Sequence, residues 1–199
     1  GDMPAYCQVS GAFVTHVAMG KTANFLATLP AAWNGKYLQM GCSGHCGTFA
    51  VSNAATPLVT ITTQGFPGEI VKKGYASFAT DEGHEGMGAG EWALNGSGQV
   101  NQDALDDFYF RADRVLARLG KEITAAFYAH ATKAQRKVSR SYFSGCSGGG
   151  RDAFVVASYF PEEFDGIMVG SAYNRMGVSM QTAGISLAAL RSADADVVA

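Results

Sequence analysis

Short apolar segments separated by glycine, proline and polar residues fill the first part of the chain. Residues 7–19 and 24–30 carry apolar side chains among polar ones and are joined by a polar turn at 20–24, which predicts a β-hairpin. Residues 37–40, 58–62 and 75–80 predict three further strands. An Asn-Gly pair at 34–35 and a proline at 30 mark the turn before the third strand.

A long helix is expected over residues 105–127. Apolar residues recur there at spacings of three and four, as on one face of a helix: Leu105, Phe108, Ala112, Val115, Leu116, Leu119, Ile123, Ala126 and Phe127. Acidic residues in its first turns suit the positive end of the helix dipole. We expect Gly120 to bend or interrupt the helix, and the basic stretch from Lys133 to Arg140 to be its solvated end.

Residues 141–151 predict a strand that turns sharply into a helix over 152–160. The pattern Gly145-x-Ser147-x-Gly149 is typical of the nucleophile elbow of α/β-hydrolases. The glycines suit this turn because a Cβ atom would collide with the neighbouring backbone. The helix N-terminus would offer unpaired N–H groups and partial positive charge to a developing oxyanion. The motif is short and also occurs in plain loops, so its strand–turn–helix context is what favours a catalytic serine.

The alternation of strands and helices, with another strand over 164–172, indicates one α/β domain with a mostly parallel sheet. The content of 47% hydrophobic and 16% charged residues indicates a globular chain of 199 residues. A net charge of −2 gives no basic surface for nucleic acid, and the apolar runs are too short to span a membrane. Residues 85–101 are expected to form a loop with a glycosylation sequon at Asn95.

The four cysteines are Cys7, Cys42, Cys46 and Cys146, and the sequence leaves their three possible full pairings open. Cys42 and Cys46 flank a histidine, but no second ligand pair follows at zinc spacing, so we predict no metal site. Disulfides in an exported protein are the simpler interpretation, and we expect a secreted or periplasmic location. The chain opens without a recognisable signal peptide, so an exported form would be mature or trimmed.

The glycine-rich stretch 41–47 directly follows the third strand. Hydrolases place a second oxyanion donor in such a loop, where backbone N–H groups do the work; a merely flexible loop is the alternative interpretation. Several motifs together then resemble the tannase and feruloyl esterase family, which includes mono(hydroxyethyl) terephthalate hydrolases. They are Cys7-x-Val9, Leu29-Pro30-x-x-Trp33-Asn34-Gly35-Lys36, Gly41-x-Ser43-Gly44, Asp81-x-Gly83-His84, Phe110-Arg111-Ala112, Tyr142-Phe143-x-Gly145-Cys146-Ser147-x-Gly149-Gly150-Arg151, and Phe160-Pro161 with Phe164-Asp165-Gly166-Ile167.

The resemblance implies a serine esterase acting on esters of aromatic acids, such as feruloyl, galloyl or terephthaloyl esters. Ser147 would form an acyl-enzyme, with the N–H groups of Gly148 and Gly44 as oxyanion donors. In the family the cysteine before the nucleophile is bonded to one beside the catalytic histidine, which gives this role to Cys146. By the same resemblance Cys7–Cys46 is the second expected disulfide, with Cys42 unpaired.

The match breaks where a catalytic base is needed, because no histidine follows Ser147. We therefore expect an N-terminal half of an α/β-hydrolase, residues 1–199, without the lid and C-terminal part. No cofactor is expected in this chain, and the family's calcium site would lie in the absent lid. Three explanations stay open: the triad acid and histidine come from a further segment or second chain linked through Cys146; the chain is an inactive binding or structural module; or His45 or His84 acts as the base.

Overall fold

The computed structural model describes residues 3–42, 44–47, 67–86, 90–133 and 137–172. These form a six-stranded sheet in the order β1-β2-β4-β3-β5-β6. The strands are β1 (Tyr6–His16), β2 (Lys21–Pro30), β3 (Lys36–Met40), β4 (Ala76–Thr80), β5 (Arg140–Cys146) and β6 (Gly166–Gly170). The predicted N-terminal hairpin is confirmed, with a short 3-10 turn, η1 (Val17–Met19), between its strands.

The sheet is mixed but mostly parallel, as predicted. β2 pairs antiparallel with β1 and β4, whereas the pairs β3–β4, β3–β5 and β5–β6 are parallel. Met40 of β3 lies level with Ala79 of β4 and Ser144 of β5. The carboxyl ends of these strands therefore meet at one edge of the sheet, where open α/β sheets place their ligands.

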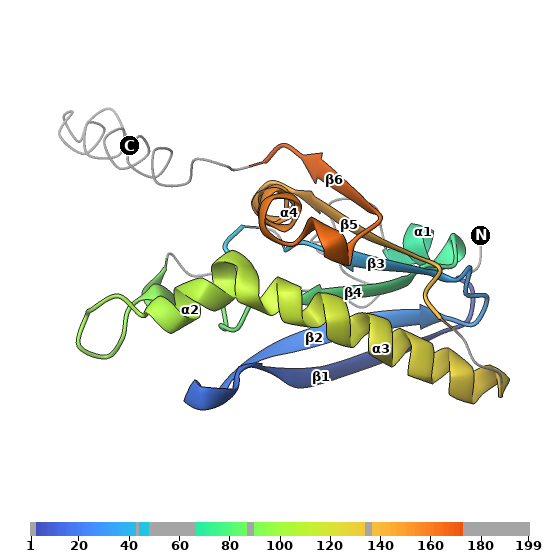
Figure 1. The fold of residues 1–199 in the computed structure, drawn as a ribbon, viewed down its shortest axis with the longest axis horizontal. Coiled ribbons are helices and arrows are strands. Elements are labelled where there is room, and N and C mark those ends of the chain that lie inside the picture. Colours follow the sequence, from blue (N-terminus) through green and yellow to red (C-terminus); the bar gives the residue numbers. More distant parts are fainter. Residues whose placement is uncertain (1–2, 43, 48–66, 87–89, 134–136, 173–199) are drawn as a thin grey trace, which may run out of the picture.

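Two helices cover one face of the sheet and a short helix lies on the other (Figure 1). α3 (Ala112–Thr132) crosses β1 to β4, and α4 (Gly148–Tyr159) packs on β5 and β6. α1 (Pro67–Lys72) lies on the opposite face, where its Ile70 shares a hollow with Leu38 of β3. A six-residue helix is too short to show a clear period, so the sequence did not predict α1.

The predicted long helix is present but is interrupted at a different place. α2 (Gln102–Asp106) continues through a π-helical turn, η4 (Asp107–Arg111), into α3. Gly120, expected to bend or break the helix, lies within the continuous α3. A Cβ atom there would lie 2.8 Å from Cε2 of Tyr37, so this glycine lets the helix approach the strand.

The core lies between α3, α4 and the sheet. Tyr37, Phe78 and Phe143 from three strands are fully buried against Leu116 and Val156 from the two helices. Two short 3-10 turns, η3 (Glu91–Ala93) and η5 (Pro161–Glu163), complete the elements. None of the helices in the described part of the chain is both long and apolar enough to cross a membrane.

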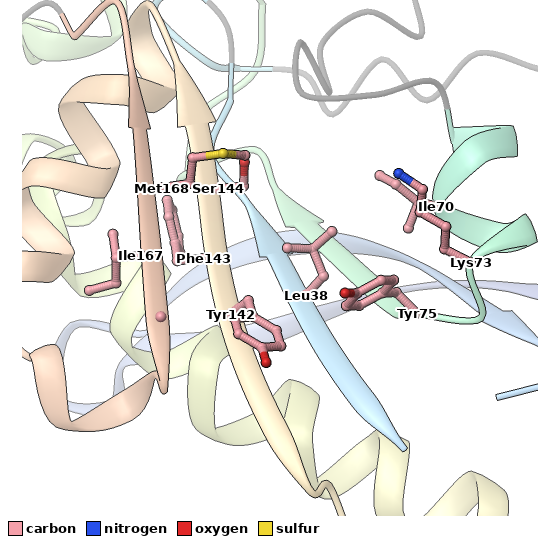
Figure 2. Close-up of a pocket in the computed structure, with 10 residues that line it drawn as sticks. Leu38, Ile70, Lys73, Tyr75, Tyr142, Phe143, Ser144, Ile167 and Met168 are labelled. Carbon is pink, nitrogen blue, oxygen red and sulfur yellow. The ribbon is translucent and has the colours of Figure 1, made fainter. Parts of the chain in front are cut away.

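The α1 face of the sheet holds a hollow of about 410 Å³ over β3, β5 and β6. Figure 2 shows Leu38, Tyr142 and Ile167 along its floor, with Ile70 and Tyr75 at one side. Ser147 is not among its lining residues, so this hollow is separate from the elbow. The strand predicted over 58–62 falls outside the described residues.

Candidate active site

Ser147 sits at a strained turn between β5 and α4. Its backbone has φ 59° and ψ −118°, a left-handed conformation that non-glycine residues rarely adopt. The residue is exposed, while its neighbours Gly148, Gly149 and Gly150 are buried. The amide of Arg151 donates to the carbonyl oxygen of Ser147 at 3.1 Å, so the helix begins directly beneath the serine. This strand–turn–helix geometry is that of a nucleophile elbow.

The glycines of the motif permit this turn by close backbone contact. A Cβ atom on Gly145 would lie 2.9 Å from Cα of Gly149 and would collide with its carbonyl oxygen. A Cβ on Gly149 would in turn lie 2.8 Å from the carbonyl oxygen of Cys42. The elbow is therefore packed directly on the loop that follows β3.

The two residues expected as oxyanion donors, Gly44 and Gly148, lie side by side. A Cβ on Gly148 would collide with the carbonyl oxygen of Gly44 and lie 3.2 Å from its nitrogen. Gly44 is exposed and has φ 60°, a conformation that favours glycine. The two backbone segments that the oxyanion prediction requires are thus adjacent to each other and to Ser147.

The expected Cys7–Cys46 disulfide is wrong: Cys42 pairs with Cys46, with their Cα atoms 5.2 Å apart, and Cys7 is an exposed free cysteine. The reason is the direction of β1. Cys7 pairs with Leu29, whereas the active edge lies level with Phe25, four residues away along β2. At about 3.3 Å per residue this is roughly 13 Å, beyond the reach of a disulfide to the β3 loop.

Cys146, expected to bond a cysteine beside the catalytic histidine, is a half-buried free cysteine. It directly precedes Ser147 at the end of β5. No other described cysteine is bonded to it, so its expected pairing stays a prediction.

A buried charge cluster lies beneath the elbow, and sequence reasoning missed it. Arg151 donates from Nη2 to Glu82 Oε2 at 2.9 Å and from Nε to Asp152 Oδ1 at 2.8 Å. Its guanidinium lies 3.6 Å from the ring centroid of Phe108. On the other side, Asp113 accepts a hydrogen bond from Gln39 at 2.8 Å. The cluster ties α3, α4, β3 and the β4 loop together at the active edge.

Burial governs the protonation of this cluster. Burial, reinforced by the charge of Asp152, raises the pKa of Glu82 well above its usual range and that of Asp113 to about 8. Burial likewise raises the pKa of Asp152, although the Arg151 charge opposes it. Burial alone would lower the pKa of Arg151, but the charges of Asp152 and Glu82 outweigh it and raise the pKa. Charged residues in the Asp81-x-Gly83-His84 and Gly150-Arg151 motifs, both at strand ends, were the available signal.

The cysteine pair and two of these carboxylates form the described cluster that could offer ligands to a metal ion. The ligand atoms of Cys42, Cys46, Glu82 and Asp152 all lie within 4.8 Å of one another. However, the disulfide uses both thiols, and the Arg151 guanidinium already supplies a cation to both carboxylates. The donor set in this state suits an ion-pair cluster better than a metal.

Neither histidine considered as a base is aimed at the nucleophile by a hydrogen bond. His84 Nε2 lies 2.7 Å from the carbonyl oxygen of His45, which only accepts, so this nitrogen carries the hydrogen. Within the described ranges, no side chain forms a hydrogen bond with the hydroxyl of Ser147. The structure thus places a nucleophile and two oxyanion segments together but brings no base to them.

Comparison with known proteins agrees with this geometry. The family model described as "Tannase and feruloyl esterase" matches residues 7–198. The chain belongs to this family. A probable feruloyl esterase from Arthroderma benhamiae is 34% identical over 146 residues, which cover 72% of this chain and 24% of that protein. The mono(2-hydroxyethyl) terephthalate hydrolase of Piscinibacter sakaiensis is 32% identical, over 92% of this chain and 29% of that protein.

Solved structures of tannase and feruloyl esterase relatives share the fold. Feruloyl esterase B from Aspergillus oryzae superposes with a TM-score of 0.65 at 24% identity, over 84% of this chain and 28% of that one. Tannin acyl hydrolase from Aspergillus niger gives 0.64 at 27% identity over the same shares. The chain therefore spans between a quarter and a third of the length of these relatives, and the fold of this portion is that of an α/β-hydrolase.

Proposed function

We propose that this chain supplies the nucleophile half of a serine esterase that cleaves esters of aromatic acids. The observation that carries the proposal is the exposed Ser147, held at φ 59° on the elbow between β5 and α4. The Oγ atom of Ser147 attacks the ester carbonyl and an alcohol leaves, giving an acyl-enzyme that water then hydrolyses. Backbone N–H groups of Gly148 and Gly44 stabilise the oxyanion.

The histidine and carboxylate of the triad come, in this proposal, from a part of the protein outside these 199 residues. The support is that a serine needs a base and that the described residues bring none to Ser147. Cys146, free and adjacent to the nucleophile, is the proposed link to the segment that carries the histidine. The reaction needs no cofactor from this chain, and the Cys42–Cys46 disulfide favours an exported protein.

The names of the relatives support an aromatic acyl group. A feruloyl esterase and a mono(2-hydroxyethyl) terephthalate hydrolase are both named for esters of aromatic carboxylic acids. We therefore propose feruloyl, galloyl or terephthaloyl esters as the substrate class.

Ester cleavage by the complete natural polypeptide, compared with its Ser147→Ala variant, tests the proposal. We expect the wild type to cleave an aromatic ester and to take one serine-directed phosphonate label on the peptide that contains Ser147, and the variant to lose both. A complete polypeptide that neither cleaves aromatic esters nor takes the label would refute it, and would favour a non-catalytic module instead. Non-reducing intact mass decides the linkage, because a bonded Cys146 adds the mass of its partner to 20.9 kDa.

A further inference from the structure

The segment Asp81–Gly86, directly after β4, is anchored firmly to β2. The carboxylate of Asp81 accepts the backbone N–H of Asn24 at 2.9 Å and its side-chain amide at 2.6 Å. The amide of Gly83 donates to the same carboxylate at 3.0 Å, which closes a tight turn. This segment is therefore a fixed part of the active edge, although the sequence analysis gave its motif no role.

The same segment holds the loop 42–47 by hydrogen bonds along its length. The amide of Gly47 donates to the carbonyl of Asp81 at 3.1 Å, and the amide of Gly86 donates to the carbonyl of Gly47 at 2.8 Å. His84 Nε2 donates to the carbonyl of His45 at 2.7 Å. The side-chain bond reaches the residue next to Gly44, closer to the oxyanion position than either backbone bond.

The imidazole of His84 is itself held in place by aromatic rings. It stacks on Trp92 at 4.0 Å between centroids and 18° between planes, and meets the edge of Phe108 at 5.8 Å. The residue is 8% exposed, and burial lowers its pKa, so the ring is neutral at pH 7. A neutral ring with the hydrogen on Nε2 is a single fixed donor aimed at one carbonyl.

We propose that His84 is a positioning residue for the oxyanion loop: its Nε2–H bond to the His45 carbonyl fixes the conformation of Gly44 against Gly148. The inference rests on the proposed function for its catalytic consequence. Gly44 is exposed and lies in the left-handed region, so its conformation needs such support from neighbouring residues. The Cys42–Cys46 disulfide closes the loop at its ends but leaves the peptide between Gly44 and His45 without a restraint of its own.

Two variants separate the hydrogen bond from the packing of the ring. His84→Phe keeps an aromatic ring for Trp92 but lacks the donor, whereas His84→Gln keeps an N–H donor near the Nε2 position. His130→Phe, a matched change in the last turn of α3, serves as the control. All are made in the complete polypeptide, and amide hydrogen exchange at Gly47 is measured together with ester hydrolysis.

We expect His84→Phe to speed exchange at Gly47 about tenfold and to lower kcat about 10- to 100-fold with little change in KM, since misplacing an oxyanion donor weakens transition-state binding. His84→Gln should recover most of both, and His130→Phe should match the wild type. Unchanged exchange and kcat in His84→Phe overturn the inference, and so does a His84→Gln variant as impaired as His84→Phe. If the wild type cleaves no ester, the proposed function fails, but Gly47 exchange still decides whether His84 holds the loop.

Discussion

Gly145→Ala is expected to disrupt the elbow by pushing α4 away from β5. The added Cβ atom would lie 2.9 Å from Cα of Gly149 and would collide with the carbonyl oxygen of that residue. Carbon atoms pack at about 3.5–4.0 Å, so the first turn of α4 has to retreat by roughly 0.6–1 Å. The contact is backbone against backbone, so no change of rotamer relieves it.

This retreat has two measurable consequences. Overpacking of a buried site costs up to about 3 kcal/mol of unfolding free energy, and we expect Gly145→Ala to reach that range. A shift of about 1 Å at the nucleophile costs roughly 100-fold in rate, so kcat of the complete polypeptide should fall by about two orders of magnitude. Urea unfolding followed by circular dichroism gives the first quantity and ester hydrolysis the second.

Gly96→Ala is the matched control. A Cβ atom at Gly96 meets nothing within 4 Å, and the residue does not need a positive φ. Its effect should stay within about 0.5 kcal/mol, as for other surface changes. If Gly145→Ala unfolds within 0.5 kcal/mol of the wild type and keeps its rate, the close packing of β5 against α4 at the elbow is not required.

Further predictions concern the charge cluster and the cysteines. The pKa of Asp113 is raised in the folded state to about 8, so the folded state binds more protons than the unfolded one and stability falls as pH rises from about 4 to about 8. Asp113→Asn should remove about 1 kcal/mol of this loss per pH unit, and parallel urea profiles for both proteins at pH 5 and 7 would contradict the assignment. Phe108→Leu, which removes the ring under Arg151, should cost about 2–3 kcal/mol in urea unfolding, whereas Tyr109→Leu, at an exposed ring, should cost less. In the 199-residue chain, alkylation under native conditions should modify two cysteines and, after reduction, four; four before reduction would exclude the disulfide.

The sequence by itself determined the local elements of this protein. Alternation at 7–30 gives the hairpin, the three-and-four spacing gives α3, and the glycines around Ser147 give the elbow. Each depends on residues close together in the chain, whose turn chemistry and periodicity can be read without knowing what packs on them. The resemblance to the tannase and feruloyl esterase family likewise rested on such local motifs.

Only the tertiary structure decided which distant residues meet. Cys42 bonds Cys46 and not the expected pair with Cys7, because β1 runs antiparallel and carries Cys7 to the far end of the sheet. Gly120 does not break the helix, because its lack of a side chain is used by Tyr37 across the core.

The same holds for the residues that support the nucleophile. Arg151 meets Glu82 across 69 positions of sequence, and His84 meets His45 across 39. Such contacts depend on strand order and register, which set where each strand ends at the active edge. The spacing of residues along the chain carries no record of these distances, so the charge cluster and the support of the oxyanion loop emerge only when the sheet is formed.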